Sequence, residues 1–116
     1  MNRKTDNVKK VIEYCTEREK ILLKNESIRK YNFYYEKMVK CANCVAEENR
    51  QVELLPYLKH ESISVKYDIA TILYRFYPEE CQQVLLDISK MTINDGIPKR
   101  LAMICVAAYD FLKYGI

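Results

Sequence analysis

The chain has 116 residues, a formal net charge of +3, and hydrophobic and charged fractions of 49% and 30%. This length and mixture fit one globular domain and exclude a wholly disordered chain, because enough apolar residues are present to build a core. With only 2 Gly and 3 Pro, the chain has few residues for the tight turns of a many-stranded sheet. We therefore predict an all-α fold that forms a single domain over residues 1–116.

The positive charge is concentrated near the start of the chain, where residues 1–30 contain nine Lys or Arg and five Asp or Glu. The acidic residues alternate with the basic ones at helical spacing, which favours a solvated helix face over a site for phosphates or lipid headgroups. Apolar residues of the same segment recur at helical spacing, and only Glu19 interrupts them. No apolar run approaches the roughly 20 residues that span a bilayer.

Apolar residues recur every three or four positions over six segments, as in helices with one buried face. Ser62 or Ser64 can cap the fourth segment. Pro78 and Pro98 stand where proline is accepted, in the first turn of the fifth and sixth segments. Pro56 is expected to bend or shorten the third segment. The predicted helices cover about residues 5–24, 27–46, 48–58, 62–76, 78–91 and 98–112, with a break over 92–96.

The central hairpin contains a repeat-like pattern. Its sequence, LLPYLKHESISVKYDIATILYRF at residues 54–76, has a leucine-rich first helix with a proline, a polar turn, and then Val followed by a basic residue. This segment resembles a HEAT repeat, although Lys66 stands where the family usually has Arg and the turn lacks the usual Asp. Six helices in units of roughly 40 residues are typical of such α-solenoids. The resemblance implies a HEAT-like, right-handed stack of about three antiparallel helix hairpins.

A second pattern extends over more of the chain, from about residue 28 to residue 109. Its signature positions are Leu54, Leu55, Leu58, Val65, Ala70, Leu73, Pro78, Glu79, Val84 and Leu85. This stretch is similar to a family of short bacterial HEAT-like proteins of unknown function, some of which are encoded near toxin genes. The resemblance implies the same fold and a protein partner, with no catalytic residues.

The five cysteines are an odd number, and the chain has no recognisable signal peptide, so we expect reduced thiols in the cytoplasm. Cys41 and Cys44 have the spacing of half a zinc site, but no second pair completes four ligands. We favour packed or half-buried thiols there, with a redox role and a metal site as the alternatives. Cys105 is expected to be the most buried cysteine.

No motif for catalysis or cofactor binding is present. His60 is the only histidine, and acid–base catalysis would require a second positioned group and a cleft beside it. The sequence contains no glycine-rich phosphate loop, no HExxH and no G-x-S-x-G motif. We therefore predict that the chain is not an enzyme and that it binds no cofactor and no metal.

Tyrosine is unusually frequent, with 10 residues and no Trp. On the fourth predicted helix Tyr67, Thr71 and Tyr74 recur on the side away from Val65 and Ile69. Second helices of HEAT pairs line a concave surface, so the resemblance places these residues on one face, where tyrosine is favoured for binding. Packing between helix pairs is an equally good alternative. The candidate partner-binding residues are Tyr34, Lys37, Lys66, Tyr67, Asp68, Thr71, Tyr74, Tyr109 and Asp110.

The preferred functional hypothesis is a cytoplasmic, non-enzymatic module that binds another protein, as an immunity or antitoxin-type inhibitor of a toxin. The alternative is a nucleic-acid-binding HEAT-like protein, because such surfaces can cradle a duplex. That alternative is disfavoured because Lys and Arg are offset by acidic residues from position 31 onward. A small enzyme is a third possibility, which would require a deep pocket with convergent polar groups.

Overall fold

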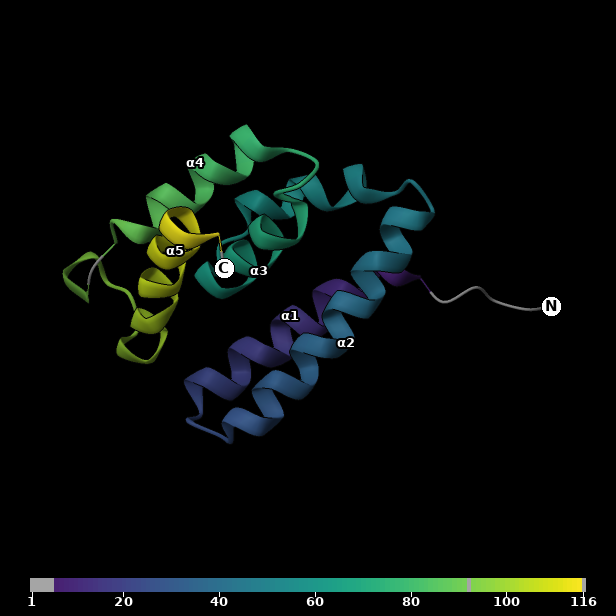
Figure 1. The fold of residues 1–116 in the computed structure, drawn as a ribbon. Coiled ribbons are helices and arrows are strands. Elements are labelled where there is room, and N and C mark those ends of the chain that lie inside the picture. Colours follow the sequence, from purple (N-terminus) through teal and green to yellow (C-terminus); the bar gives the residue numbers. More distant parts are fainter. Residues whose placement is uncertain (1–5, 92, 116) are drawn as a thin grey trace.

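The computed structural model describes residues 6–91 and 93–115, and every regular element within these ranges is helical. The all-α prediction is confirmed for this part of the chain. Residues 5 and 92, where the first helix and the later break were predicted to begin, lie outside the described residues. The α-helices are α1 (Asn7–Leu23), α2 (Ile28–Glu47), α3 (Ile63–Leu73), α4 (Pro78–Ser89) and α5 (Ala102–Tyr114) (Figure 1). Three 3-10 segments join them, namely η1 (Gln51–Lys59), η2 (Ile93–Asp95) and η3 (Lys99–Leu101).

Local chemistry explains where the helices begin. The Asp6 carboxylate accepts hydrogen bonds from two backbone amides in the first turn of α1, at 3.1 and 3.3 Å. Ser62, rather than Ser64, caps α3, and its hydroxyl accepts a hydrogen bond from the Val65 amide at 3.2 Å. Pro78 occupies the first turn of α4. Backbone amides in the first turn of a helix have no acceptor within the helix, so the amide hydrogen that proline lacks costs no hydrogen bond there.

The third predicted helix, over residues 48–58, is wrong in type and in start. The segment is the 3-10 element η1, and Pro56 lies inside it. Proline has no amide hydrogen for a bond to the carbonyl four residues earlier, and its ring clashes with that turn of an α-helix. Asn49, with a positive φ of 57°, follows the end of α2. Asn tolerates this left-handed conformation, so the chain turns before η1 begins.

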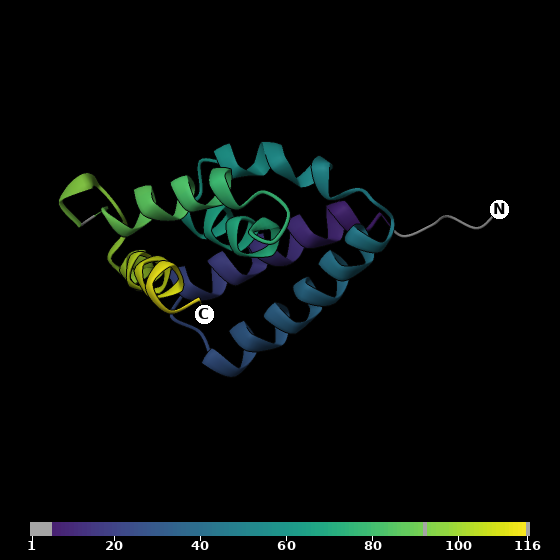
Figure 2. The same cartoon turned by 45° about the horizontal axis from the view of Figure 1, so that its top comes forward.

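Helix α3 lies at the centre of the arrangement. It contacts α1, η1, α4 and α5, while α1 packs along α2 and α4 packs along α5. In both views α2 and α5 stand on either side of α3 (Figures 1 and 2). The molecule measures 51 × 32 × 24 Å. The order of the helices along a right-handed solenoid stays a prediction.

The cysteines follow this packing. Cys15 and Cys81 have no exposed surface, whereas Cys105 keeps 7% of its surface exposed. The expectation that Cys105 is the most buried is therefore wrong. Cys15 lies between α1 and α2, with its Sγ 3.3 Å from the sulfur of Met38, whereas Cys105 borders a surface hollow on α5. In the structure all five cysteines are free thiols, and their reduced state in the cell stays a prediction.

Leu73 lies on the inward face of α3 and has no exposed surface. We expect Leu73→Asp to lower the free energy of unfolding by about 3 kcal/mol or more, because the substitution buries an unpaired charge. Leu86→Asp is the matched control, since Leu86 on α4 is 37% exposed and should cost well under half as much. Chemical denaturation followed by circular dichroism measures both. Equal losses in the two variants would contradict this packing.

Candidate functional site

A groove lies between α2 and α5, with α3 as its floor. It consists of two adjoining hollows of about 370 and 480 Å³, which share Tyr35, Thr71 and Phe111. We call it the α2–α5 groove. Its lining residues are Arg18 from α1; Asn32, Tyr35, Val39, Ala42 and Asn43 from α2; Tyr67, Thr71 and Ile72 from α3; Tyr74 and Arg75 just beyond it; and Phe111 and Gly115 near the end of the chain.

The groove combines aromatic rings with uncharged polar groups and with the side chains of Arg18 and Arg75. The rings of Tyr74 and Phe111 meet edge to face, with centroids 5.2 Å apart at 67°. Tyr35 is 45% exposed, so its ring is available to a ligand. The Thr71 hydroxyl donates a hydrogen bond to the backbone carbonyl of Asp68 at 2.8 Å. Aromatic walls with hydroxyl and amide groups suit a peptide surface, because they offer large contact area and adaptable hydrogen bonds.

A buried ion pair lies beneath this groove. Arg18 of α1 and Asp68 of α3 retain only 5% and 1% exposure, and the Arg18 Nη1 donates to the Asp68 carboxylate. The Arg18 guanidinium also lies over the ring of Tyr31, 4.0 Å from its centroid, and 5.0 Å from that of Tyr35. Burial raises the pKa of Asp68 to about 6, although Arg18 opposes this shift. The pair therefore joins the first two helices to the groove floor.

Three of the predicted binding residues do meet in the groove. Tyr67, Thr71 and Tyr74 all line it and are half-buried. Burial raises the pKa of Tyr67, and the charges of Asp68 and Asp110 contribute to this rise. Asp110 is thus within electrostatic range of Tyr67 but does not line the groove.

Asp68 does not belong to an exposed face, and its assignment as a surface binding residue is wrong. Its carboxylate points into the interior, where it pairs with Arg18. The error has a physical cause. On α3, position 68 lies beside the inward positions Val65 and Ile69. Consecutive residues of a helix are about 100° apart, so a small error in the predicted rotation of the helix moves a residue from the inward to the outward face.

The remaining candidates lie outside the groove. Tyr34 packs its ring 5.9 Å from that of Tyr14 on α1. The Lys37 ammonium lies 5.0 Å from the ring centroid of Phe33 on the outer side of α2. Tyr109, which is 52% exposed, borders a separate hollow on α5. The proposed continuous tyrosine face is therefore divided among several surfaces.

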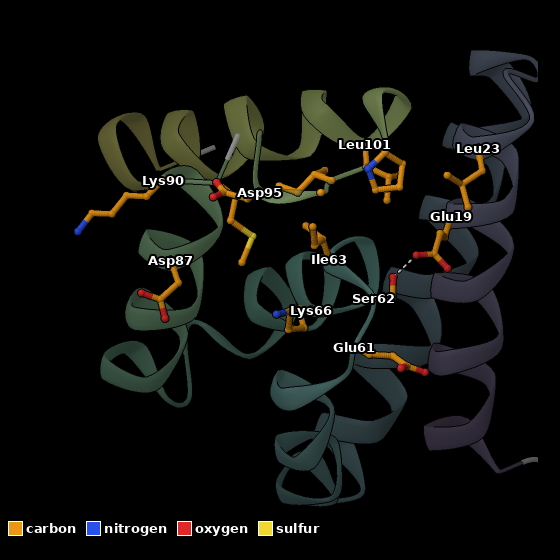
Figure 3. A pocket seen from close by; sticks show the side chains of 14 residues that line it. Glu19, Leu23, Glu61, Ser62, Ile63, Lys66, Asp87, Lys90, Asp95 and Leu101 are labelled. Atoms are coloured by element: carbon orange, nitrogen blue, oxygen red, sulfur yellow. Dashed lines mark hydrogen bonds between the residues drawn. The ribbon is translucent and has the colours of Figure 1, made fainter. Parts of the chain in front are cut away.

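Lys66 borders a different cavity, of about 660 Å³, between α1, the start of α3, the end of α4 and residues 95–101 (Figure 3). Its floor is aliphatic, with Leu23 and Ile63 among the lining residues, while its rim carries both acidic and basic side chains. The Ser62 hydroxyl donates to the Glu19 carboxylate at one edge. Within the described residues, no group of three or more His, Cys, Asp or Glu side chains is arranged to hold a metal ion.

Sequence reasoning missed most of the groove residues, among them Arg18, Tyr35 and Phe111. Arg18 follows the buried Cys15 by three positions and Val11 by seven, so its place on the inward stripe was visible in the spacing. Tyr35 follows the buried Tyr31 by four positions, so helical spacing alone places it on the inward side of α2. In the structure it is 45% exposed and lines the groove.

No protein-family model, curated protein or solved structure matches the sequence. In the part of the chain that the structure describes, no helix is both long enough and apolar enough to cross a bilayer. The geometry of the groove is therefore the main guide to function.

The buried Asp68 makes the stability of the fold depend on pH. In the folded chain the pKa of Asp68 is about 6, against 3.8 for the ordinary carboxyl, so the folded state binds more protons between these values. The free energy of unfolding should consequently rise as the pH falls, by about 1 kcal/mol from pH 7 to pH 5. Denaturation of wild type and Asp68→Asn at both pH values isolates this contribution. An identical pH dependence of the two proteins would contradict it.

Proposed function

We propose that this chain is a non-enzymatic protein-binding module that holds a segment of a partner protein in the α2–α5 groove. The observation that carries the proposal is the convergence of four aromatic side chains from three parts of the fold: Tyr35 of α2, Tyr67 and Tyr74 in and after α3, and Phe111 of α5. Such residues bury much area for little conformational entropy and dominate binding energy at interfaces.

The dimensions suit a short helix of the partner. Lining residues on α2 extend from Asn32 to Asn43, a distance of roughly 16 Å at 1.5 Å per residue. An amphipathic helix of about three turns has this length, and its apolar face would lie against the rings of Tyr35 and Phe111. Asn32, Asn43 and Thr71 supply hydrogen-bonding groups beside those rings.

The chemistry of the groove supports binding rather than catalysis. The carboxylate of Asp68, beneath the floor, is buried against Arg18. The single histidine, His60, is in a turn before α3, where its Nδ1 accepts a hydrogen bond from the Ser62 amide at 2.9 Å. No nucleophile and base face each other among the groove residues, which is what acyl or phosphoryl transfer would require.

We further propose a HEAT-like arrangement in which α2, α3 and α5 are the second helices of three stacked hairpins. The resemblance to short bacterial HEAT-like proteins, some encoded near toxin genes, favours a toxin as the partner and an immunity or antitoxin-type role. Blocking a toxin would require only a tight, complementary surface, and an aromatic groove supports that role because binding needs no catalytic chemistry.

Two double-site variants test the proposal. We expect Tyr35→Ala combined with Phe111→Ala to weaken binding of the partner by at least roughly tenfold, because both rings lie at the centre of the groove. The matched control is Tyr109→Ala with Tyr114→Ala, which removes two aromatic rings that are 52% and 63% exposed on α5 outside the groove. The partner is taken from affinity capture with the wild type, and its affinity for each variant is measured by calorimetry.

The outcome separates the proposal from its alternative. A partner that binds both double variants equally well would place the interface outside the groove. A generic DNA or RNA duplex bound at low salt and released at high salt would instead favour the nucleic-acid hypothesis, because phosphate contacts are strongly salt-dependent. Photocrosslinking from position 71, on the groove floor, should yield an adduct with the partner, whereas crosslinking from position 52 should not.

A further inference from the structure

Two thiols and three ammonium groups gather on the side of α2 that faces away from the groove. Cys41 and Cys44 are both half-buried free thiols, and neither lines the groove. Partial burial raises the pKa of Cys41 and the neighbouring Cys44 adds to the rise, whereas the charges of Lys10, Lys37 and Lys40 oppose it. Lys10 comes from α1, so the cluster spans the seam of the first hairpin. These five side chains have no part in the proposed binding function.

Helix geometry decides what two cysteines at this spacing can do. In an α-helix, Cβ atoms three residues apart are separated by about 5–6 Å. A disulfide needs Cβ atoms within about 4.5 Å, so direct bonding would distort α2, which is a regular helix over these positions. With a metal–sulfur bond of about 2.3 Å, as for zinc, an ion bound to both sulfurs holds the two sulfur atoms up to about 4.6 Å apart. A bridging ion thus fits the helix better than a disulfide.

We propose that Cys41 and Cys44 bind one copper(I) ion as a two-coordinate bis-thiolate. Zinc is disfavoured because a structural zinc site requires four ligands, and no third His, Cys, Asp or Glu joins the pair within the described residues. Soft thiolate ligands select copper(I), which is stable with two of them.

Charge balance favours the same ion. On binding, each thiol releases one proton, and the ion accepts one sulfur lone pair from each thiolate, with no change of oxidation state. The resulting complex carries a net charge of −1, since two thiolates surround one monovalent cation. Lys10, Lys37 and Lys40 lie within electrostatic range of Cys41 and stabilise that charge. Two thiolates with a divalent cation would form a neutral complex, which gains no such stabilisation from the lysines.

The test is an anaerobic titration of the full chain with copper(I) in competition with a chromophoric copper(I) chelator. We expect one equivalent to transfer to the wild type and none to Cys41→Ser or Cys44→Ser. Cys105→Ala, which removes a thiol on α5, should keep the full equivalent. Lys37→Gln should weaken binding roughly three- to tenfold, while Lys113→Gln, on α5, should leave it unchanged.

Several results would overturn the proposal. These are retention of all copper(I) by the chelator, unchanged binding to both serine variants, or a stoichiometry of one ion to two chains, which would indicate bridging between molecules. Circular dichroism verifies that the serine variants keep the helicity of the wild type. If one of them unfolds, the comparison of Lys37→Gln with Lys113→Gln decides the question, because equal affinities would exclude this cluster as the site.

Discussion

The rest of the structure depends on the burial of α3. Val65, Ile69, Ala70 and Leu73 have at most 1% of their surface exposed, and the helix contacts α1, η1, α4 and α5. A helix that is apolar over most of its circumference is stable only when neighbours cover it. In this fold the neighbours cover all but one side, and that side becomes the floor of the groove. The candidate site is thus the part of the central helix that packing leaves open.

The Arg18–Asp68 pair connects this core to the groove. Taking two charges out of water is costly, and a well-packed apolar pair is often as stable or more stable. Loss of one partner is far more damaging, typically about 3–5 kcal/mol, because the other charge is left buried alone. The pair therefore fixes the positions of helices more than it adds stability. It ties α1 to α3 and holds the guanidinium over the rings of Tyr31 and Tyr35.

The two proposed sites use different sides of one helix. Tyr35, Val39 and Asn43 face the groove, whereas Cys41 and Cys44 do not line it. Because a helix rotates by about 100° per residue, neighbouring positions on α2 serve surfaces that have different chemistry. The groove offers aromatic rings, neutral polar groups and two arginines, while the cysteine side offers sulfur and lysine side chains. Neither proposed site uses residues of the other, so substitutions can remove one site and leave the other in place.

The sequence by itself determined the helical class and most helix boundaries. Apolar periodicity, the serine cap at Ser62 and the proline at Pro78 act over a few residues, and so they can be recognised without knowledge of the fold. The sequence predicted that Pro56 would bend or shorten the third helix, but it did not predict that the whole segment would be a 3-10 helix. That outcome also depends on Asn49, whose left-handed conformation sets where η1 can begin.

Only the tertiary structure decided which side chains share a surface. Tyr67, Thr71 and Tyr74 are neighbours within one turn or two, so their common face followed from helical spacing alone. Arg18 and Asp68 are 50 positions apart, and their pairing depends on how α1 is rotated against α3. If a helix turned about its axis by the roughly 100° that separates consecutive residues, a core position would become an exposed one. Local spacing cannot fix that rotation, because it is set by the packing of all the helices together.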